Sequence, residues 1–323
     1  MRSTDWHLTE DIDGFLDRAG DFLLSRPALH NTPLTMIERL RTRGVDPASG
    51  AEVGVFFGRL ETGGEVHAIL YRAPSYRLTL THLSPGQADV LAAHLTGLGH
   101  SLSGVTADHD TATAFAEAWQ RYAGPTPVRS WRGRLYRLGT LTPPEPCPEG
   151  RGRVAGERDH EQLIRWCGEF VADVGEAPAI DADSWADSRF ADKHFTFWEA
   201  PDGTPVSMAG STSMVGGMVR VDPVYTPAHL RSLGYAGAVT VEASGAALAA
   251  GATDVVLFTN PANSTSNALY QRLGYVPVAD FTGYDFTRDD APGASQGVER
   301  PAGSASQVSS GTRQELRMPA TSV

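Results

Sequence analysis

The segment Pro227-Ala228-His229-Leu230-Arg231-Ser232-Leu233-Gly234-Tyr235-Ala236 carries the most information in this chain. It leads into a helical run from Gly237 to Ala250, so it predicts a strand, a tight turn and then a helix N-terminus. Such a turn gathers main-chain N–H groups and the positive end of the helix dipole at one point, where an anion such as phosphate can be held. Gly234 allows close backbone approach or a positive φ, Arg231 supplies a planar fork for phosphate oxygens, and Ser232 adds a hydroxyl donor. The plain alternative is a strand-to-helix loop with a surface arginine.

Apolar periodicity places this turn within a regular succession of elements. The segment Val255-Val256-Leu257-Phe258 is continuously apolar and indicates a buried strand after the helix. The elements expected in the second half are a strand at 153–155, a helix at 159–174, strands at 195–199, 205–215 and 218–226, a helix from 234 to 250, a strand at 254–259, a short helix at 267–273 and a strand at 275–286.

The first half repeats this order without the basic turn. Its expected elements are helices at 9–25 and 33–42, strands at 52–60, 65–71 and 76–82, a helix at 85–98, a strand at 101–106, a helix at 110–122 and a strand at 127–138. In place of the basic turn stands His82-Leu83-Ser84-Pro85-Gly86-Gln87, where Ser84-Pro85 predicts an ordinary N-cap with proline at the first helical position. We interpret this as an internal duplication whose first copy does not bind phosphate.

Two changes of composition predict the domain boundaries. Four prolines fall within residues 143–148, so 141–150 is expected to be an extended linker between a first domain at 1–140 and a second at 151–288. Residues 289–323 lack periodic apolar positions, and we expect a disordered tail that cannot offset its ordering entropy.

Charge and cysteine content exclude several classes of protein. The chain has 323 residues, is 41% hydrophobic and carries a formal net charge of -11, which argues against binding to nucleic acid or to an anionic membrane. The two cysteines, Cys147 and Cys167, have no metal-ligand spacing and form no disulfide framework, and no metal site is expected. No secretory signal or membrane-spanning apolar run is visible, so the expected location is the cytoplasm.

Two motifs resemble those of the GNAT superfamily of N-acetyltransferases. The pattern Arg-x-x-Gly-x-Ala at 231–236 resembles that family's acyl-CoA pyrophosphate loop, although Leu233 stands where a basic residue is frequent. The segment from Asn260 to Tyr275 resembles the family segment that ends in a leucine-tyrosine-x-x-leucine-glycine-aromatic pattern. The resemblance implies an α/β (α+β) fold of two tandem GNAT-like domains, each a twisted, mixed, mostly antiparallel sheet flanked by helices, with the acetyl-CoA motif in the C-terminal half.

The same resemblance implies specific roles for residues of the second half. Acetyl-CoA would be the co-substrate, and the contacts to it would come from Val224, Tyr225, Thr226, Arg231, Ser232, Leu233, Gly234, Tyr235, Ala236 and Asn263. Tyr270 would act as the general acid beside the thioester sulfur, and its plain alternative is a core aromatic. The strand at 224–226 would pair through its backbone with the pantetheine amides, and its plain alternative is simple sheet pairing.

The expected function is acetyl transfer to a primary amine by direct attack on the thioester, because no nucleophile arrangement is present. The acceptor would be a small-molecule or peptide amine, and the oligomeric state is not indicated. Asp222 is the leading candidate for the general base, with Glu176 and Glu199 behind it; each is alternatively a solvated carboxylate, and a water chain is a further alternative. The rival function is a non-catalytic acyl-CoA sensor or scaffold.

Overall fold

The protein is described by a computed structural model that covers residues 4–44, 54–73, 77–175, 180–186 and 188–287. The predicted disordered tail at 289–323 and the candidate base Glu176 lie outside these residues. None of the helices in the described residues is both long enough and apolar enough to cross a membrane.

The predicted order of helices and strands is found in both halves. The elements of the first half are β1 (Thr4–Thr9), α1 (Ile12–Leu24), α2 (Asn31–Arg43), β2 (Phe56–Thr62), β3 (Glu65–Arg72), β4 (Leu78–Leu80), α3 (Pro85–Gly97), β5 (Gly104–Asp108), α4 (His109–Ala123) and β6 (Thr126–Leu138). Strand β1 was not predicted, because only Trp6 and Leu8 are apolar in it.

The second half repeats the pattern from its own first strand. Its elements are β7 (Arg151–Val154), α5 (His160–Asp173), β8 (His194–Glu199), β9 (Pro205–Ser211), β10 (Met218–Tyr225), α6 (Tyr235–Ala249), β11 (Asp254–Thr259), α7 (Ser264–Arg272) and β12 (Tyr275–Thr287). Helix α7 begins three residues earlier than predicted, because the Asn263 side chain accepts a hydrogen bond from Ser266 N and caps it.

The strands form one continuous sheet whose order is symmetric about its centre. That order is β1-β2-β3-β4-β5-β12-β6-β11-β10-β9-β8-β7, so each strand of the first half has its counterpart at the mirrored position in the second. Both halves contain one parallel pair, β4 with β5 and β10 with β11. This symmetry agrees with the predicted fold of two tandem mixed α/β units.

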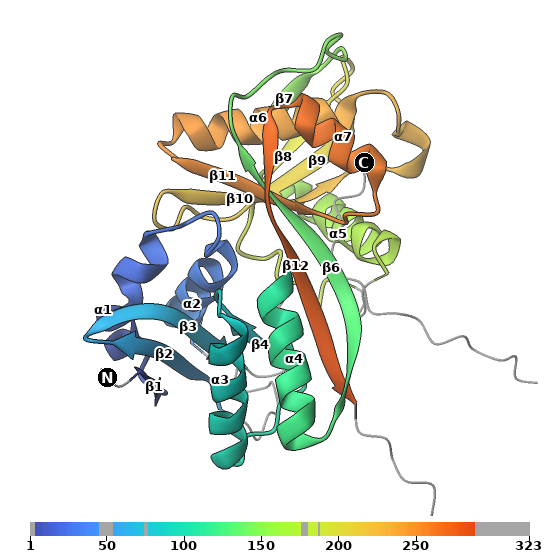
Figure 1. Ribbon diagram of the computed structural model, residues 1–323. Coiled ribbons are helices and arrows are strands. Elements are labelled where there is room, and N and C mark those ends of the chain that lie inside the picture. The colour runs from blue at the N-terminus through green and yellow to red at the C-terminus, as the bar shows by residue number, and fades with distance from the viewer. Residues whose placement is uncertain (1–3, 45–53, 74–76, 176–179, 187, 288–323) are drawn as a thin grey trace, which may run out of the picture.

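The two halves exchange their last strands. Strand β12 of the second half pairs on one side with β5 and on the other with β6, and β6 of the first half pairs in turn with β11. Figure 1 shows β6 and β12 side by side, running between the two lobes. The linker therefore separates the halves in sequence, but the sheet does not divide there.

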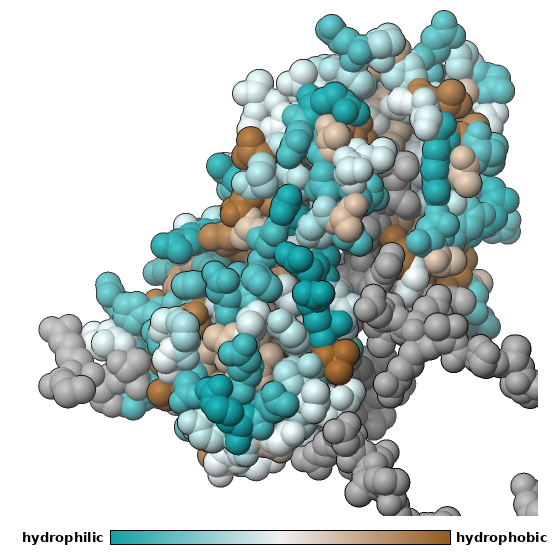
Figure 2. Space-filling view, turned by 45° about the vertical axis from the view of Figure 1, so that its right-hand side comes forward, coloured by the Kyte–Doolittle hydropathy of each residue, from teal (hydrophilic) through white to brown (hydrophobic). Residues whose placement is uncertain are grey.

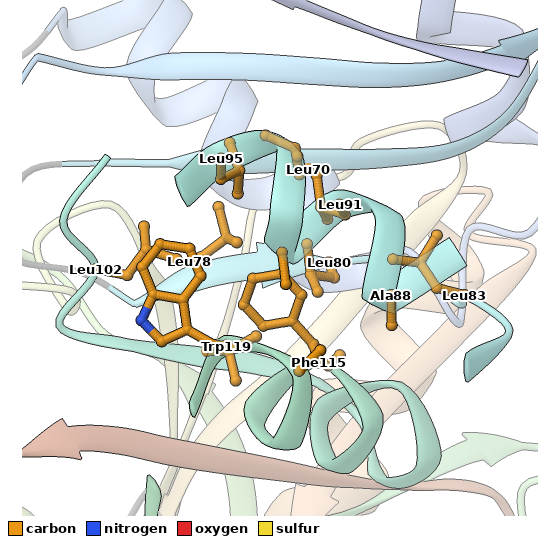
Figure 3. Close-up of a cluster of buried hydrophobic side chains, with 14 of the residues drawn as sticks. Leu70, Leu78, Leu80, Leu83, Ala88, Leu91, Leu95, Leu102, Phe115 and Trp119 are labelled. Carbon is orange, nitrogen blue, oxygen red and sulfur yellow. The ribbon is translucent and has the colours of Figure 1, made fainter. Parts of the chain in front are cut away.

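Four clusters of buried apolar side chains stabilise this sheet. In the first half, α3 and α4 cover one face of the sheet through leucines and the rings of Phe115 and Trp119 (Figure 3). The opposite face is covered by α1 and α2, and their cluster reaches across to Met218 of β10 and Val256 of β11. Helices of the first half thus pack directly on the strands that will carry the second-half site.

The linker crosses the outer side of α6. Ideal Cβ atoms on Gly237 and Gly245 would each lie 3.7 Å from a linker side chain, Pro144 and Leu141 respectively. The small residues of α6 let the linker approach the helix closely on one side while the sheet packs on the other.

The face of the molecule seen in Figure 2 is mainly hydrophilic, with small separate hydrophobic patches.

Candidate functional site

Strands β10 and β11 are paired over only part of their length. Their parallel register comprises Met218 with Asp254, Val219 with Val255, and Arg220 with Val256. Beyond these pairs β10 continues to Tyr225 along β9, while β11 continues to Thr259 along β6. The two strands therefore diverge after Arg220 and leave an opening in the sheet at their carboxyl ends.

The predicted turn lies at the end of this opening. Ser232 has φ 65° and Gly234 has φ 84°, so two left-handed residues reverse the chain before α6. The first intrahelical hydrogen bond runs from Ala238 N to Gly234 O, which leaves the amides of residues 235–237 without an intrahelical acceptor. Residues 232–234 are exposed and the cap residue has no side chain, whereas Ala236 and Gly237 are buried, so the positive end of α6 faces an exposed turn.

Arg231, predicted to contact phosphate, bonds to other parts of the protein in this structure. Its Nε donates to Thr226 O at 3.0 Å, and its guanidinium forms an ion pair with Asp173 of α5. The side chain therefore fixes the turn to the end of β10. For Arg231 to contact phosphate directly, its side chain must leave Thr226 O and Asp173.

The linker flanks the turn without covering it. An ideal Cβ on Gly234 would lie 3.6 Å from Cδ of Pro148, an ordinary van der Waals distance. Gly234 is nevertheless exposed, so Pro148 borders one side of the first turn. Ala236 and Gly237, at the first turn of α6, are buried, and an ideal Cβ on Gly237 would lie 3.3 Å from Leu269 and 3.7 Å from Pro144. The exposed part of the predicted loop is therefore residues 232–234.

The predicted backbone segment at the opening is buried. Val224, Tyr225 and Thr226 are all less than 5% exposed. The carbonyl of Tyr225 accepts from Ser207 Oγ at 3.0 Å, and that of Thr226 accepts from Arg231. The proposed pairing of these residues with pantetheine stays a prediction.

Asn263 and Tyr270 both interact with other residues of the protein. Asn263 caps α7, and the neighbouring Asn267 receives hydrogen bonds from the hydroxyls of Tyr136 at 2.9 Å and Thr259 at 2.7 Å. Tyr270 is 0% exposed, and its ring meets that of Tyr275 edge-on at 5.9 Å between centroids. Tyr270 belongs to the same buried cluster as Val221 and Val224 of β10, so the ring lies on the α6 side of the opening.

Asp222 lies at the start of the divergent part of β10, inside a group of cations. Its carboxylate forms ion pairs with Lys193 and, at 3.6 Å, with Arg189, and its carbonyl accepts from Lys193 Nζ at 2.6 Å. Burial acts to raise the pKa of Asp222, but the charges of Lys193, Arg189 and Arg220 outweigh it and hold this pKa well below its ordinary value. A carboxylate stabilised in this way is a poor proton acceptor, so the geometry does not favour the base role.

Glu199 is the other candidate base within the described residues, and it also forms ion pairs. It contacts Arg153 and Arg151, and the hydrogen bond from Arg153 lowers its pKa. It lies on β8, at the β7 edge of the sheet, away from the opening. Its position gives no support to a role in proton transfer.

A cavity of about 370 Å³ adjoins Asp222 on the face covered by α2. Its lining combines α2, the segment before β8, the connection between β9 and β10, and β10 itself. Sequence reasoning missed the residues that α2 and the pre-β8 segment contribute, because nothing local in their sequence indicates a cavity wall. No group of three or more potential metal ligands is found in the described residues.

The first half has a corresponding opening but a different helix N-terminus. Strands β4 and β5 are paired at only two positions, Leu78 with Val105 and Thr79 with Thr106. At α3, however, Ser84 and Gln87 form a capping box in which each side chain bonds the other's main-chain N–H. In the first-half helix the capping box engages Gln87 N, and proline at the first position has no N–H, whereas no side chain caps α6.

The comparisons with known proteins support the fold. No family model matches the chain, and no curated protein matches its sequence. Among solved structures, a Drosophila protein is 12% identical, with 90% of this chain and 100% of that chain covered and a TM-score of 0.57. A GCN5-related N-acetyltransferase from Sphaerobacter thermophilus is 17% identical over 86% of this chain and 94% of its own, with a TM-score of 0.51.

A tandem arrangement is also represented among the solved structures. The tandem GNAT protein from the clavulanic acid biosynthesis pathway is 14% identical, with 87% of this chain and 98% of that chain covered and a TM-score of 0.51. At these identities the likeness concerns the fold, and a tandem protein among the matches agrees with the repeated order of strands in the two halves. The chain therefore has the fold of the GNAT superfamily, with two GNAT-like halves in tandem.

Proposed function

We propose that the C-terminal half of this protein transfers an acetyl group from acetyl-CoA to a primary amine. The observation that carries the proposal is the exposed turn at 232–234, whose left-handed residues leave the N-terminal amides of α6 open beside the divergent strands. An open helix N-terminus binds anionic groups such as a diphosphate, and the opening beside it offers a strand edge to an extended amide chain.

The reaction would proceed by direct attack. The amine nitrogen forms a bond to the thioester carbonyl carbon, the carbon–sulfur bond breaks, and the departing thiolate receives a proton. Tyr270 is the proposed donor of that proton, because a thiolate is already a good leaving group and a phenol at hydrogen-bond distance is an adequate acid for it. The phenolate would then regain a proton from water. The proton lost by the amine would leave through water, since Asp222 and Glu199 are both held as ion pairs.

The first test separates the role of the turn from general folding. Gly234→Glu places a carboxylate at the turn and should weaken CoA binding at least about tenfold, because it repels the diphosphate. Gly234→Asn is the conformational control, since asparagine tolerates a left-handed φ, and it should bind within a few-fold of wild type. Gly86→Glu, at the corresponding turn of the first half, should leave CoA affinity unchanged. Titration calorimetry with CoA measures all three, and unchanged affinity in Gly234→Glu would refute the proposal.

One observation keeps the non-catalytic alternative in view. Tyr270 is completely buried among apolar neighbours, whereas a general acid must reach the sulfur. Thiol release from acetyl-CoA across grouped small-molecule and peptide amines decides between the two functions. Binding of acetyl-CoA with no thiol release for any amine would identify a sensor or scaffold.

A further inference from the structure

The cavity beside Asp222 is built by both halves of the chain and is rich in cations. Four cationic side chains line it, Arg39 from α2, Arg189 and Lys193 from the segment before β8, and Arg220 from β10. Three carboxylates oppose them, from Glu38, Asp192 and Asp222. The lining thus carries one positive charge in excess, in a chain whose net charge is -11.

Two of the three carboxylates are also shared with cations outside the cavity. Glu38 pairs with Arg41 at 2.9 Å, and Asp192 pairs with Arg43. Neither Arg41 nor Arg43 lines the cavity, so these two arginines neutralise part of the negative charge of Glu38 and Asp192 from outside it. Within the cavity, Arg39 pairs with Asp192 at 3.6 Å, and Lys193 and Arg189 pair with Asp222, so the cations are partly compensated and one positive charge remains in excess.

Arg220 has a buried donor that no group of the described residues satisfies. Its Nη1 donates to Asn31 Oδ1 at 3.1 Å, which joins the first half to β10. Its Nε is buried and has no hydrogen-bond partner within the described part of the chain. A buried N–H of a charged group without an acceptor is costly, and a ligand that supplies an acceptor removes that cost. Nε belongs to the edge of the guanidinium that carboxylates engage through two parallel hydrogen bonds.

Hydroxyl groups also line the cavity, and several already bond within the protein. Thr35 Oγ1 donates to Asn31 O at 2.9 Å, and Thr212 Oγ1 accepts from Arg220 N at 3.0 Å. Thr32 and Thr35 of α2 line the cavity from the first half, and Thr212 and Ser213 line it from the connection before β10. Lys193 is 4% exposed, and burial lowers its pKa to about 8. An anion in the cavity would offset the crowding of Lys193, Arg189 and Arg220.

We propose that this cavity binds the carboxylate of an acyl acceptor, so that the accepted amine belongs to a small amino carboxylate. The inference rests on the proposed acyl transfer for the role of the amine. The carboxylate group supplies one negative charge against the single excess positive charge of the lining, and about 370 Å³ accommodates a molecule of amino-acid size. Arg220 and Asp222 flank the point where β10 leaves β11, so a carboxylate held there lies next to the opening in which the thioester would be attacked.

The proposal also assigns a purpose to the first half. Helix α2 supplies Arg39 and two of the hydroxyls, and Asn31 at its start orients Arg220. The first half would then contribute acceptor specificity, while the second half contributes the CoA turn.

The test compares amino carboxylates with their own amides. Glycine, β-alanine, 4-aminobutyrate and the common L-amino acids are titrated calorimetrically without CoA, each against its carboxamide, which keeps the amine and removes the negative charge. At least one carboxylate should bind about 10- to 100-fold more tightly than its amide, the range expected for hydrogen bonds to a charged group. If no amino carboxylate exceeds its amide, the cavity proposal is wrong.

Variants locate the site. Arg220→Lys keeps the charge but loses the planar fork, and it should lower the affinity for the preferred carboxylate at least about tenfold without changing CoA affinity. Arg39→Gln, at the α2 side, should lower it by several-fold, and it keeps the test decisive if Arg220→Lys does not fold. Arg121→Gln, at an exposed residue of α4 that pairs with Asp89, is the matched control and should bind as wild type. Unchanged carboxylate affinity in both folded cavity variants would overturn the proposal.

The two proposals fail in different ways. Carboxylate binding that depends on Arg220, in a protein that does not bind CoA, would support the cavity site and reject acyl transfer. CoA binding and thiol release with no preference for carboxylates over amides would support acyl transfer and reject the cavity site.

Discussion

The ion pair between Asp222 and Lys193 allows a test that separates structure from catalysis. Asp222→Asn removes the negative charge and leaves Lys193, whose side chain is 4% exposed, next to Arg189 and Arg220. Stranding one member of a buried ion pair costs about 3–5 kcal/mol of the free energy of unfolding. Lys193 could instead lose its proton in the folded variant. Its ordinary pKa is 10.5, so losing the proton at pH 7 costs about 4.8 kcal/mol, at about 1.36 kcal/mol per pH unit. This cost is an upper limit of similar size on the loss in free energy of unfolding.

We therefore expect Asp222→Asn to lower the free energy of unfolding at pH 7 by about 3–5 kcal/mol. The double variant Asp222→Asn/Lys193→Met should recover at least half of that loss, since it removes the stranded charge as well. Asp280→Asn is the matched control, because Asp280 pairs with Arg134 at the sheet surface, and its loss should be about 1 kcal/mol or less.

Chemical denaturation followed by tryptophan fluorescence measures the stabilities, and thiol release measures turnover. Asp222→Asn with wild-type stability and a large loss of turnover would show that the carboxylate accepts a proton, and that our structural explanation of it is wrong. A double variant as unstable as the single one would also contradict the reasoning, because the loss would then not come from Lys193.

Two further predictions concern Tyr270 and Asp159. Tyr270→Phe should leave CoA affinity close to wild type and slow turnover by about 10² or more, as measured by calorimetry and thiol release; wild-type turnover would remove this hydroxyl from the mechanism. The hydrogen bond from Arg153 lowers the pKa of Asp159 to about 2 from 3.8, so this carboxylate contributes roughly 2 kcal/mol of stability that is present above pH 4 and lost as the pH falls from 3.8 towards 2. Wild type should therefore exceed Asp159→Asn in unfolding free energy at pH 6, with the difference vanishing near pH 2; a difference that does not depend on pH would contradict this assignment.

Local signals in the sequence were sufficient for most of the elements. The Ser84-Pro85 cap, the left-handed Gly234 and the apolar run at 255–258 each depend on interactions within a few residues, so their consequences appear in the sequence itself. Where the signal was weak, as in β1 with two apolar residues, the strand was missed. The roles predicted for Tyr270, Asn263 and the 224–226 segment are compatible with their positions but are not tested by them.

The exchange of β6 and β12 and the cavity could be recognised only in the tertiary structure. Strand pairing across more than 130 residues, as between Leu138 and Tyr275, depends on register and burial that no local pattern encodes. The low pKa of the Asp222 carboxylate likewise depends on Lys193, which lies 29 residues earlier in the chain. It also depends on Arg220, which Asn31 of the first half holds through a hydrogen bond. The sequence alone thus determined a repeated order of elements and a glycine turn before α6, because both follow from short-range chemistry. The tertiary structure decided which charges meet at β10, because that depends on how the two halves fold together.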